Sequence, residues 1–254
     1  MLVRGLCLAA VLSSFVPPPP APLLVSAATS LTDALEEIGR DYAASGGGTV
    51  RFNFAASNVL ARQIVSGAPA DVFISADEAQ MAVVQKAGAV APGSRLDVVS
   101  NQLVVAALAG RAAFVAARFA EAPPEIRRLA LGDPAAVPAG VYARQYLEAR
   151  GLWKAYEARI VPAGNVRAAL VALENGAADA AIVYATDMTI ARGAVVAFAI
   201  PPNQGPRIVY PAAILTTTSN QSAAKRFLAF VAGSRAAEVF RRYRFLPIPR
   251  NERR

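Results

Sequence analysis

The sequence predicts an α/β protein of two lobes, in which each lobe is a mostly parallel sheet flanked by helices. The 254 residues are enough for two modest domains, and 55% of them are hydrophobic. Apolar residues alternate between a period of two and a period of about 3.6 for most of the length, which indicates repeated strand–helix units. Such units pair their strands in parallel and cover both faces of the sheet.

The first half of the chain contains three strand–helix units. Gly46 to Gly48 end the first helix, and Gly67 and Gly88 end the next two, because glycine readily terminates a helix. Residues 30–33, Ser-Leu-Thr-Asp, approximate a capping box at the first helix start. We expect strands at residues 23–28, 50–54 and 71–75, and helices at residues 31–42, 60–65 and 76–87.

The second half repeats the pattern and contains two expected crossings between lobes. A long strand at 98–108 includes the first crossing near 100–102, and the linker-like segment PPNQGP at 201–206 is the second. Two crossings divide the chain into lobe 1, residues 22–101 and 203–254, and lobe 2, residues 102–202. We expect strands at 129–131, 159–161, 180–184, 194–200 and 208–218, and helices at 140–149, 166–173, 222–233 and 235–245.

The first 21 residues have the pattern of a signal peptide. Arg4 supplies a positive charge, an apolar stretch follows from Gly5 to Val16, and four prolines end it. Export from the cytoplasm is therefore expected. The single cysteine, Cys7, lies inside this segment, too early for a lipid-anchor site, so the mature chain would carry no thiol. No apolar run of about 18 residues follows that would cross a membrane.

Composition excludes several classes of function. The chain has no histidine, which removes the commonest general base and the Ser-His-Asp triad. No P-loop or GxGxxG motif is present, and the carboxylates do not cluster like a metal site. The net charge of +8 comes mostly from scattered arginines; the arginine-rich C-terminus, which starts at Arg241, is predicted to be a solvated helix face and tail. We expect no enzyme activity, no cofactor and no nucleic-acid partner.

Two stretches share a layout in which an apolar strand runs into a serine that opens a helix. Ser30 and Ser57 occupy the two turns. A helix N-terminus presents unpaired N–H groups and a partial positive charge, so two facing ends form an anion site without basic side chains. The alternative is that both serines are ordinary N-caps, each contributing about 1 kcal/mol to stability.

Several segments in order carry a resemblance to a known family. They are AATSLTDAL, FAASNVLARQIVSGAPADVFISAD, GDPAAVPAGVYAR, NVRAALVALENGAADAAIVYATD, IVYP and AAEVFRRYRF. The chain resembles the periplasmic molybdate-binding proteins of ABC transporters. The resemblance implies a two-lobed periplasmic-binding-protein fold and a monomeric receptor. Such a receptor holds molybdate or tungstate between its lobes through neutral hydrogen-bond donors and delivers it to a membrane permease.

The same resemblance implies which residues bind the oxyanion. Ser30 and Ser57 match the two serines, Ala139 and Val166 match backbone donors at helix starts in lobe 2, and Tyr184 matches a hydroxyl donor. Tyr184 is alternatively a tyrosine at the edge of the core. Two nearby arginines, Arg62 and Arg167, are interpreted as solvated helix faces.

Two departures from the family pattern surround the serines. Thr29 stands where the family usually has alanine, and Ala56 stands where serine is common. The first adds a hydroxyl near the expected site and the second removes one. The rival functions are a receptor for sulfate or phosphate, the effector domain of a transcription regulator, and a serine hydrolase. The regulator would need a DNA-binding helix-turn-helix, and the hydrolase has no base.

Overall fold

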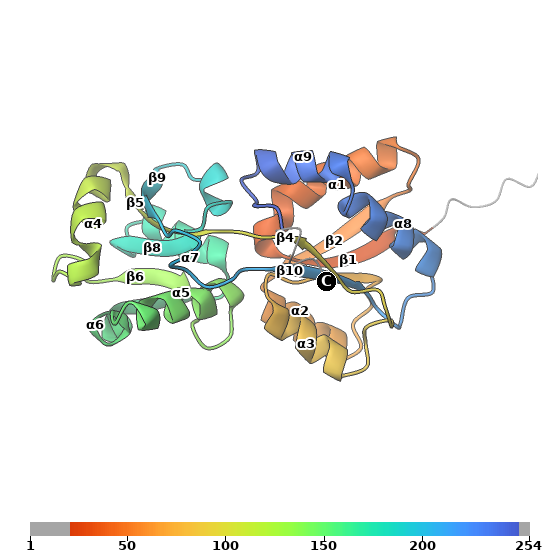
Figure 1. Cartoon of the computed structure of the whole chain (residues 1–254), viewed down its shortest axis with the longest axis horizontal. Helices are drawn as coiled ribbons and strands as arrows, with labels where there is room; N and C mark the ends of the chain where they lie inside the picture. Colours follow the sequence, from red (N-terminus) through yellow and green to blue (C-terminus); the bar gives the residue numbers. More distant parts are fainter. Residues whose placement is uncertain (1–20, 249–254) are drawn as a thin grey trace, which may run out of the picture.

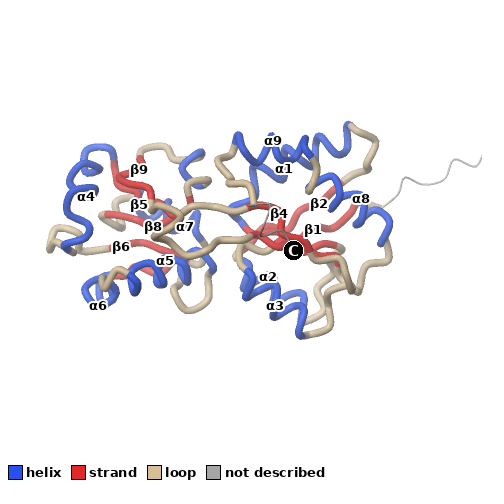
Figure 2. Tube along the Cα trace, in the orientation of Figure 1, coloured by secondary structure: helices blue, strands red, loops and turns tan. Residues whose placement is uncertain are grey.

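The computed structural model describes residues 21–248 and contains two five-stranded sheets. Figures 1 and 2 show them side by side along the long axis, each with its own helices. The predicted signal peptide lies outside the described residues apart from Ala21. No helix in the described part of the chain is long and apolar enough to cross a membrane.

The first sheet takes strands from both ends of the chain. Three neighbouring strands are parallel, and β10 is antiparallel to both of its neighbours, β3 and β4. One strand in five therefore runs against the others. The spatial order is β2 (Val50–Ala55), β1 (Leu23–Ala28), β3 (Val72–Ile74), β10 (Tyr210–Ile214) and β4 (Leu96–Val99).

The second sheet is built from the middle of the chain and has the same plan. Here β5 is the strand that runs antiparallel to both neighbours, β8 and β9. The expectation of mostly parallel sheets is confirmed in both lobes. The spatial order is β7 (Ile160–Ala163), β6 (Leu129–Gly132), β8 (Ala180–Tyr184), β5 (Leu103–Leu108) and β9 (Ala194–Ala199).

Helices cover both faces of the first sheet and pack against the second. In Figure 1 the first sheet lies between α1, α8 and α9 on one side and α2 and α3 on the other. In the second lobe α5 and α7 pack on β6 and β8, and α4 packs on β5 and β9. The bounds are α1 (Thr32–Ala44), α2 (Ser57–Val65), α3 (Glu78–Lys86), α4 (Ala112–Arg118), α5 (Pro138–Ala149), α6 (Trp153–Tyr156), α7 (Val166–Glu174), α8 (Gln221–Val231) and α9 (Ser234–Arg242).

The core follows the alternation read from the sequence. Strand β8 is buried at every position, because helices cover both faces of this central strand. In lobe 1 a separate apolar cluster lies under α2 and α3, formed by residues such as Leu60, Phe73 and Met81. These two packed layers hold the helix starts in fixed positions relative to the strand ends.

The long strand expected at 98–108 is in fact two strands in different sheets. Strand β4 ends at Val99 in the first sheet and β5 begins at Leu103 in the second, so the chain passes between sheets at residues 100–102. It returns between β9 and β10. The crossing expected near residues 100–102 is confirmed, but the apolar residues on its two sides, 98–99 and Leu103–Leu108, were read as one strand.

Candidate functional site

The candidate site is a small cavity between the two sheets, with a volume of about 20 Å³. All five residues predicted to bind an anion line it: Ser30, Ser57, Ala139, Val166 and Tyr184. Each of them is at least 95% buried. Residues as far apart in the sequence as Ser30 and Tyr184, which are separated by 154 positions, therefore converge on one small space.

The walls of the cavity are formed mainly by the starts of helices. A short 3₁₀ turn, Thr29–Leu31, leads into α1, and α2, α5 and α7 begin at the same place. The residues before the 3₁₀ turn, α2 and α5 make no side-chain cap. First-turn N–H groups are thus left without side-chain acceptors, and the positive ends of the helix dipoles face a common centre.

The Ser30 hydroxyl is not a helix cap. Its oxygen lies 3.0 Å from the hydroxyl of Tyr210, on β10. Helix α1 starts only at Thr32 and has no side-chain cap, so the expected capping box at residues 30–33 is wrong. The 3₁₀ turn places Ser30 before the helix, where its side chain points back toward the sheet instead of along the helix.

The Ser57 hydroxyl is likewise occupied by a tertiary contact. Ser57 is the first residue inside α2, and its oxygen accepts a hydrogen bond from the backbone N–H of Ala76 at 2.9 Å. The alternative of a plain N-cap is therefore wrong for this serine too. This bond ties the start of α2 to the segment between β3 and α3, and both segments line the cavity.

Close packing positions the start of α5. A Cβ on Gly140 would meet the carbonyl oxygen of Gly132 at 1.9 Å, so only glycine lets the helix approach the end of β6 this closely. Pro138 occupies the first turn, where its missing N–H costs nothing. Ala139 is held between these two residues with its backbone at the cavity.

The start of α7 is capped by the side chain of Asn165, which accepts a hydrogen bond from the N–H of Ala168 at 2.9 Å. This cap uses one of the first-turn N–H groups and leaves that of Val166 at the cavity wall. The side chain of Val166 is buried, so the residue's polar contribution to the cavity comes from its backbone.

Tyr184 ends β8 and places a buried hydroxyl at the cavity. This oxygen makes no hydrogen bond of normal geometry with any described residue. Burial raises the pKa of Tyr184 well above its usual value, and the nearby Tyr210 hydroxyl adds to this effect. The phenol is therefore a neutral group whose hydrogen-bonding capacity is unused in the protein itself.

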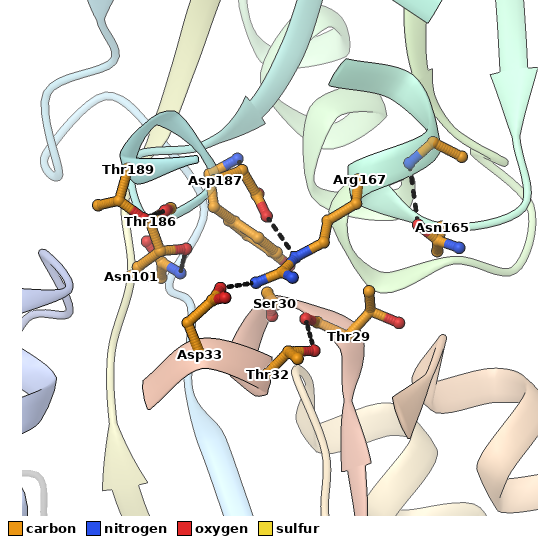
Figure 3. Close-up of polar contacts among 12 residues, drawn as sticks. Thr29, Ser30, Thr32, Asp33, Asn101, Asn165, Arg167, Thr186, Asp187 and Thr189 are labelled. Atoms are coloured by element: carbon orange, nitrogen blue, oxygen red, sulfur yellow. Dashed lines mark hydrogen bonds and ion pairs between the residues drawn. The ribbon is translucent and has the colours of Figure 1, made fainter. Parts of the chain in front are cut away.

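An ion pair joins the two lobes beside the cavity. Arg167 on α7 contacts Asp33 on α1, and its Nε lies 4.0 Å from a carboxylate oxygen of Asp187 (Figure 3). The side chain of Arg167 is only 21% exposed. The interpretation of Arg167 as a solvated helix face is therefore wrong, whereas Arg62 is exposed.

Asp187 is the most perturbed carboxyl near the cavity. Its burial raises the pKa from 3.8 to about 7, although the Tyr184 N–H and the charge of Arg167 oppose this effect. The Tyr184 N–H donates to Asp187 at 3.1 Å. Asp187 thus orients the end of β8, and neither it nor any other carboxylate lines the cavity.

The cavity therefore presents neutral donors and no ionised side chain. No group of three or more His, Cys, Asp or Glu residues that could hold a metal ion occurs in the part of the chain that the structure describes. An enclosed site of converging N–H groups and hydroxyls is suited to a small anion that carries its own oxygen acceptors.

Two sets of residues at the site were not predicted from the sequence. Tyr210 and Asn101 stand behind Ser30, and Asp33 pairs with Arg167. Tyr210 lies in the quoted IVYP segment, and Asn101 is the middle one of three polar residues at the expected crossing, so each left a weak signal. Nothing in the sequence pattern pairs Asp33 with a residue 134 positions away.

Comparison with known proteins identifies the class. Residues 23–246 match the family described as bacterial extracellular solute-binding protein, and the chain belongs to this family. The molybdate-binding protein ModA of Escherichia coli (strain K12) is 35% identical over 229 residues, which cover 88% of each chain. The resemblance inferred from the sequence segments is thereby confirmed.

Solved structures agree with this assignment. The Azotobacter vinelandii periplasmic molybdate-binding protein superimposes with a TM-score of 0.78 at 28% identity, covering 90% of this chain and all of that one. The sulfate-binding protein SubI from Mycobacterium tuberculosis H37Rv superimposes with a TM-score of 0.74 at 18% identity, covering 91% and 88%. At this lower identity the likeness shows the two-lobed fold alone.

Proposed function

We propose that this protein is a periplasmic receptor that captures molybdate, and also tungstate, in the cavity between its lobes and delivers it to an ABC permease. It acts as a monomer, performs no covalent chemistry and needs no resident cofactor. The observation that carries the proposal is the convergence of five buried residues on one uncharged cavity: Ser30, Ser57, Ala139, Val166 and Tyr184. The similarity to molybdate-binding relatives supports the same ligand.

The geometry assigns complementary roles to the ligand and the protein. Molybdate already carries four oxygen atoms around its metal, so the protein groups donate hydrogen bonds to oxygen and do not coordinate molybdenum. Hydrogen bonds to a charged acceptor are stronger than those between neutral groups. Helix starts in both lobes add a favourable electrostatic field without any counter-charge to desolvate.

Selectivity follows from the rigidity and the donor character of the cavity. Helix starts fixed by close packing, as at Gly140, do not move inward to reach a smaller oxyanion. Hydrogen phosphate would bring a proton that needs an acceptor, and no carboxylate lines the cavity. Sulfate is the main alternative ligand, because it is a fully ionised tetrahedral dianion and SubI shares the fold.

Calorimetry on the purified mature protein tests the proposal. Molybdate and tungstate should bind with one site per chain, and both should raise the melting temperature by mass action. Sulfate and phosphate at the same concentrations should do little. Equal affinity for sulfate and molybdate would contradict the size argument, and absence of binding by all four would contradict the function.

A further inference from the structure

Behind Ser30 a continuous series of buried hydrogen bonds reaches the crossing segment. The Ser30 oxygen lies 3.0 Å from the Tyr210 hydroxyl, which receives a hydrogen bond from the side-chain amide of Asn101, also at 3.0 Å. The same amide nitrogen donates to the Thr186 hydroxyl at 3.0 Å, a contact visible in Figure 3. All four residues are at least 95% buried, so bulk solvent does not compete for these hydrogen bonds.

The direction of these hydrogen bonds is fixed at Asn101. The Asn101 oxygen accepts the backbone N–H of Gln102 at 2.8 Å, which identifies the other end of the amide as nitrogen. This nitrogen has two hydrogens and no acceptor capacity. One hydrogen points to Thr186 and the other to Tyr210. Asn101 therefore donates to Tyr210, and the opposite direction is chemically excluded.

Donors and acceptors can be assigned in the same way between Tyr210 and Ser30. Tyr210 is fully buried, and burial raises the pKa of its phenol, which stays protonated. With its oxygen occupied by Asn101, the phenol has one hydrogen to place. Two oxygens face it: that of Ser30, at 3.0 Å, and the Tyr184 hydroxyl, which interacts with Tyr210 but makes no hydrogen bond of normal geometry. Ser30 is therefore the better-placed acceptor. If Tyr210 donates to Ser30, the phenol hydrogen has a partner at 3.0 Å; if Ser30 donates to Tyr210, that buried hydrogen has only the poorly placed Tyr184 hydroxyl, which is costly.

We propose that Tyr210 and Asn101 are positioning residues that set the direction of the Ser30 hydroxyl, so that its hydrogen points into the cavity toward the bound oxyanion. This inference rests on the proposed function. Ser57 reaches the same state by a different route, because its oxygen accepts the backbone N–H of Ala76. Both serines then enter the cavity as donors only, and the arrangement is complete before the ligand arrives.

The series of hydrogen bonds from Asn101 through Tyr210 to Ser30, which we call the relay, also links the anion site to the crossing between lobes. Asn101 lies in the crossing segment, and Thr186 follows β8 in lobe 2. The orientation of a lobe 1 hydroxyl thus depends on a residue that contacts both lobes. A change in the crossing segment that withdraws the Asn101 amide would release the Tyr210 phenol and leave Ser30 free to rotate away from the ligand.

The test removes the Tyr210 hydroxyl and keeps its ring. Tyr210→Phe should bind molybdate about tenfold more weakly in calorimetry, because Ser30 no longer has a fixed direction. Tyr156→Phe is the matched control: this buried hydroxyl donates to the carbonyl of Phe119 at 2.7 Å, away from the cavity. The control should lose similar stability in urea unfolding and keep wild-type affinity.

A double-mutant cycle separates positioning from a general structural effect. In a Ser30→Ala background, Tyr210→Phe should cost no further affinity, because the group it orients is gone. An equal loss in both backgrounds, or wild-type affinity in Tyr210→Phe, would overturn the relay while leaving molybdate binding intact. A wild-type protein that binds no molybdate would overturn the proposed function and the relay with it.

A second variant reverses the relay without removing the ring system. Asn101→Asp replaces the donating amide by a carboxyl that accepts, so the Tyr210 phenol turns toward it and accepts from Ser30 instead. Molybdate affinity should fall at least as much as is expected for Tyr210→Phe. This variant therefore tests the proposal even if Tyr210→Phe folds poorly. Wild-type affinity in folded Asn101→Asp would show that the direction of the bond has no role.

Discussion

The two lobes bring different kinds of hydrogen-bond donor to the cavity. Lobe 1 supplies Ser30 and Ser57, whose oxygens already have partners within the protein. Lobe 2 supplies backbone groups at Ala139 and Val166 and the Tyr184 hydroxyl, which has no partner among the described residues. The lobe 1 hydroxyls are therefore oriented by the protein itself, whereas lobe 2 contains a buried hydroxyl that no described residue satisfies. The comparison teaches that the two halves of one site respond differently to the same kind of substitution.

The largest effect on molybdate affinity is expected from a substitution in lobe 1. Ser57→Ala removes a donor to a buried dianion and should weaken molybdate binding by about 1.5–3 kcal/mol. It should also destabilise the fold by roughly 1 kcal/mol, because the Ala76 N–H loses its acceptor. Ser94→Ala is the control, since the Ser94 oxygen accepts the N–H of Ile214 at 3.1 Å outside the cavity. Unchanged molybdate affinity in Ser57→Ala would place the anion elsewhere.

A pH-dependent effect is expected from lobe 2. The pKa of Asp187 is raised to about 7 in the folded protein, whereas the unfolded value is near 3.8. The folded state therefore binds more protons between these values, and the free energy of unfolding should fall as pH rises from about 4 to 7 and level off above. The difference between these two pKa values corresponds to a loss of roughly 4 kcal/mol. Urea unfolding at several pH values measures it.

Asp187→Asn is the matched variant for this prediction. The amide oxygen can still accept the N–H of Tyr184, so the end of β8 keeps its orientation. The variant should lose the dependence on pH between 4 and 7. A slope as large as that of the wild type would assign the pH dependence to another group, such as Asp77, whose pKa burial also raises.

The next effect has opposite signs for stability and binding. Tyr184→Phe removes a buried hydroxyl that has no partner, so the free protein should become more stable by about 1 kcal/mol. Molybdate binding should weaken by about 1 kcal/mol, because one donor is lost. Tyr156→Phe, which breaks a satisfied hydrogen bond, should change stability in the opposite direction and leave affinity alone. A destabilised Tyr184→Phe would mean that the hydroxyl is already satisfied in the free protein.

The smallest effect concerns the contact between lobes. Arg167→Gln breaks the partly solvated ion pair with Asp33 and the longer contact, 4.0 Å, with the buried Asp187; because the closer pair is partly solvated, molybdate affinity should fall by less than about 1 kcal/mol. The loss should shrink at high salt. Arg235→Gln, whose partner Asp41 lies in the same lobe, should have no effect on affinity. Small-angle scattering with and without molybdate then reports whether the variant closes less completely than the wild type.

Local pattern predicted the units of this fold well. The strands and helices around Leu23 to Val65 were expected from periodicity and glycine stops, and the structure contains them within a few residues. Periodicity did not show that residues 98–108 form two strands, because only three polar residues, 100–102, separate two apolar strands that belong to different sheets. It also left helix α4 unrecognised.

In the candidate site too, residues with a local sequence signal were predicted and residues without one were missed. The five lining residues were carried over from motif segments, because helix starts after strands leave a local signature. Tyr210, Asn101 and Asp33 act through partners 180, 109 and 134 positions away, respectively, and side-chain pairing over such distances leaves no local signature. Both serines were open to a capping interpretation for the same reason: their true partners belong to other strands and loops.

The position of β10 inside the first sheet has a consequence for the order of folding. This strand pairs with β3 and β4 on its two sides, yet it follows them by more than 100 residues. Lobe 1 therefore lacks a central strand until nearly the whole chain has been made, while the second sheet comes from one continuous stretch, Leu103–Ala199. Long-range pairing forms slowly and leaves strand edges exposed in the meantime. The lobe that begins the chain is expected to be the last to complete its structure.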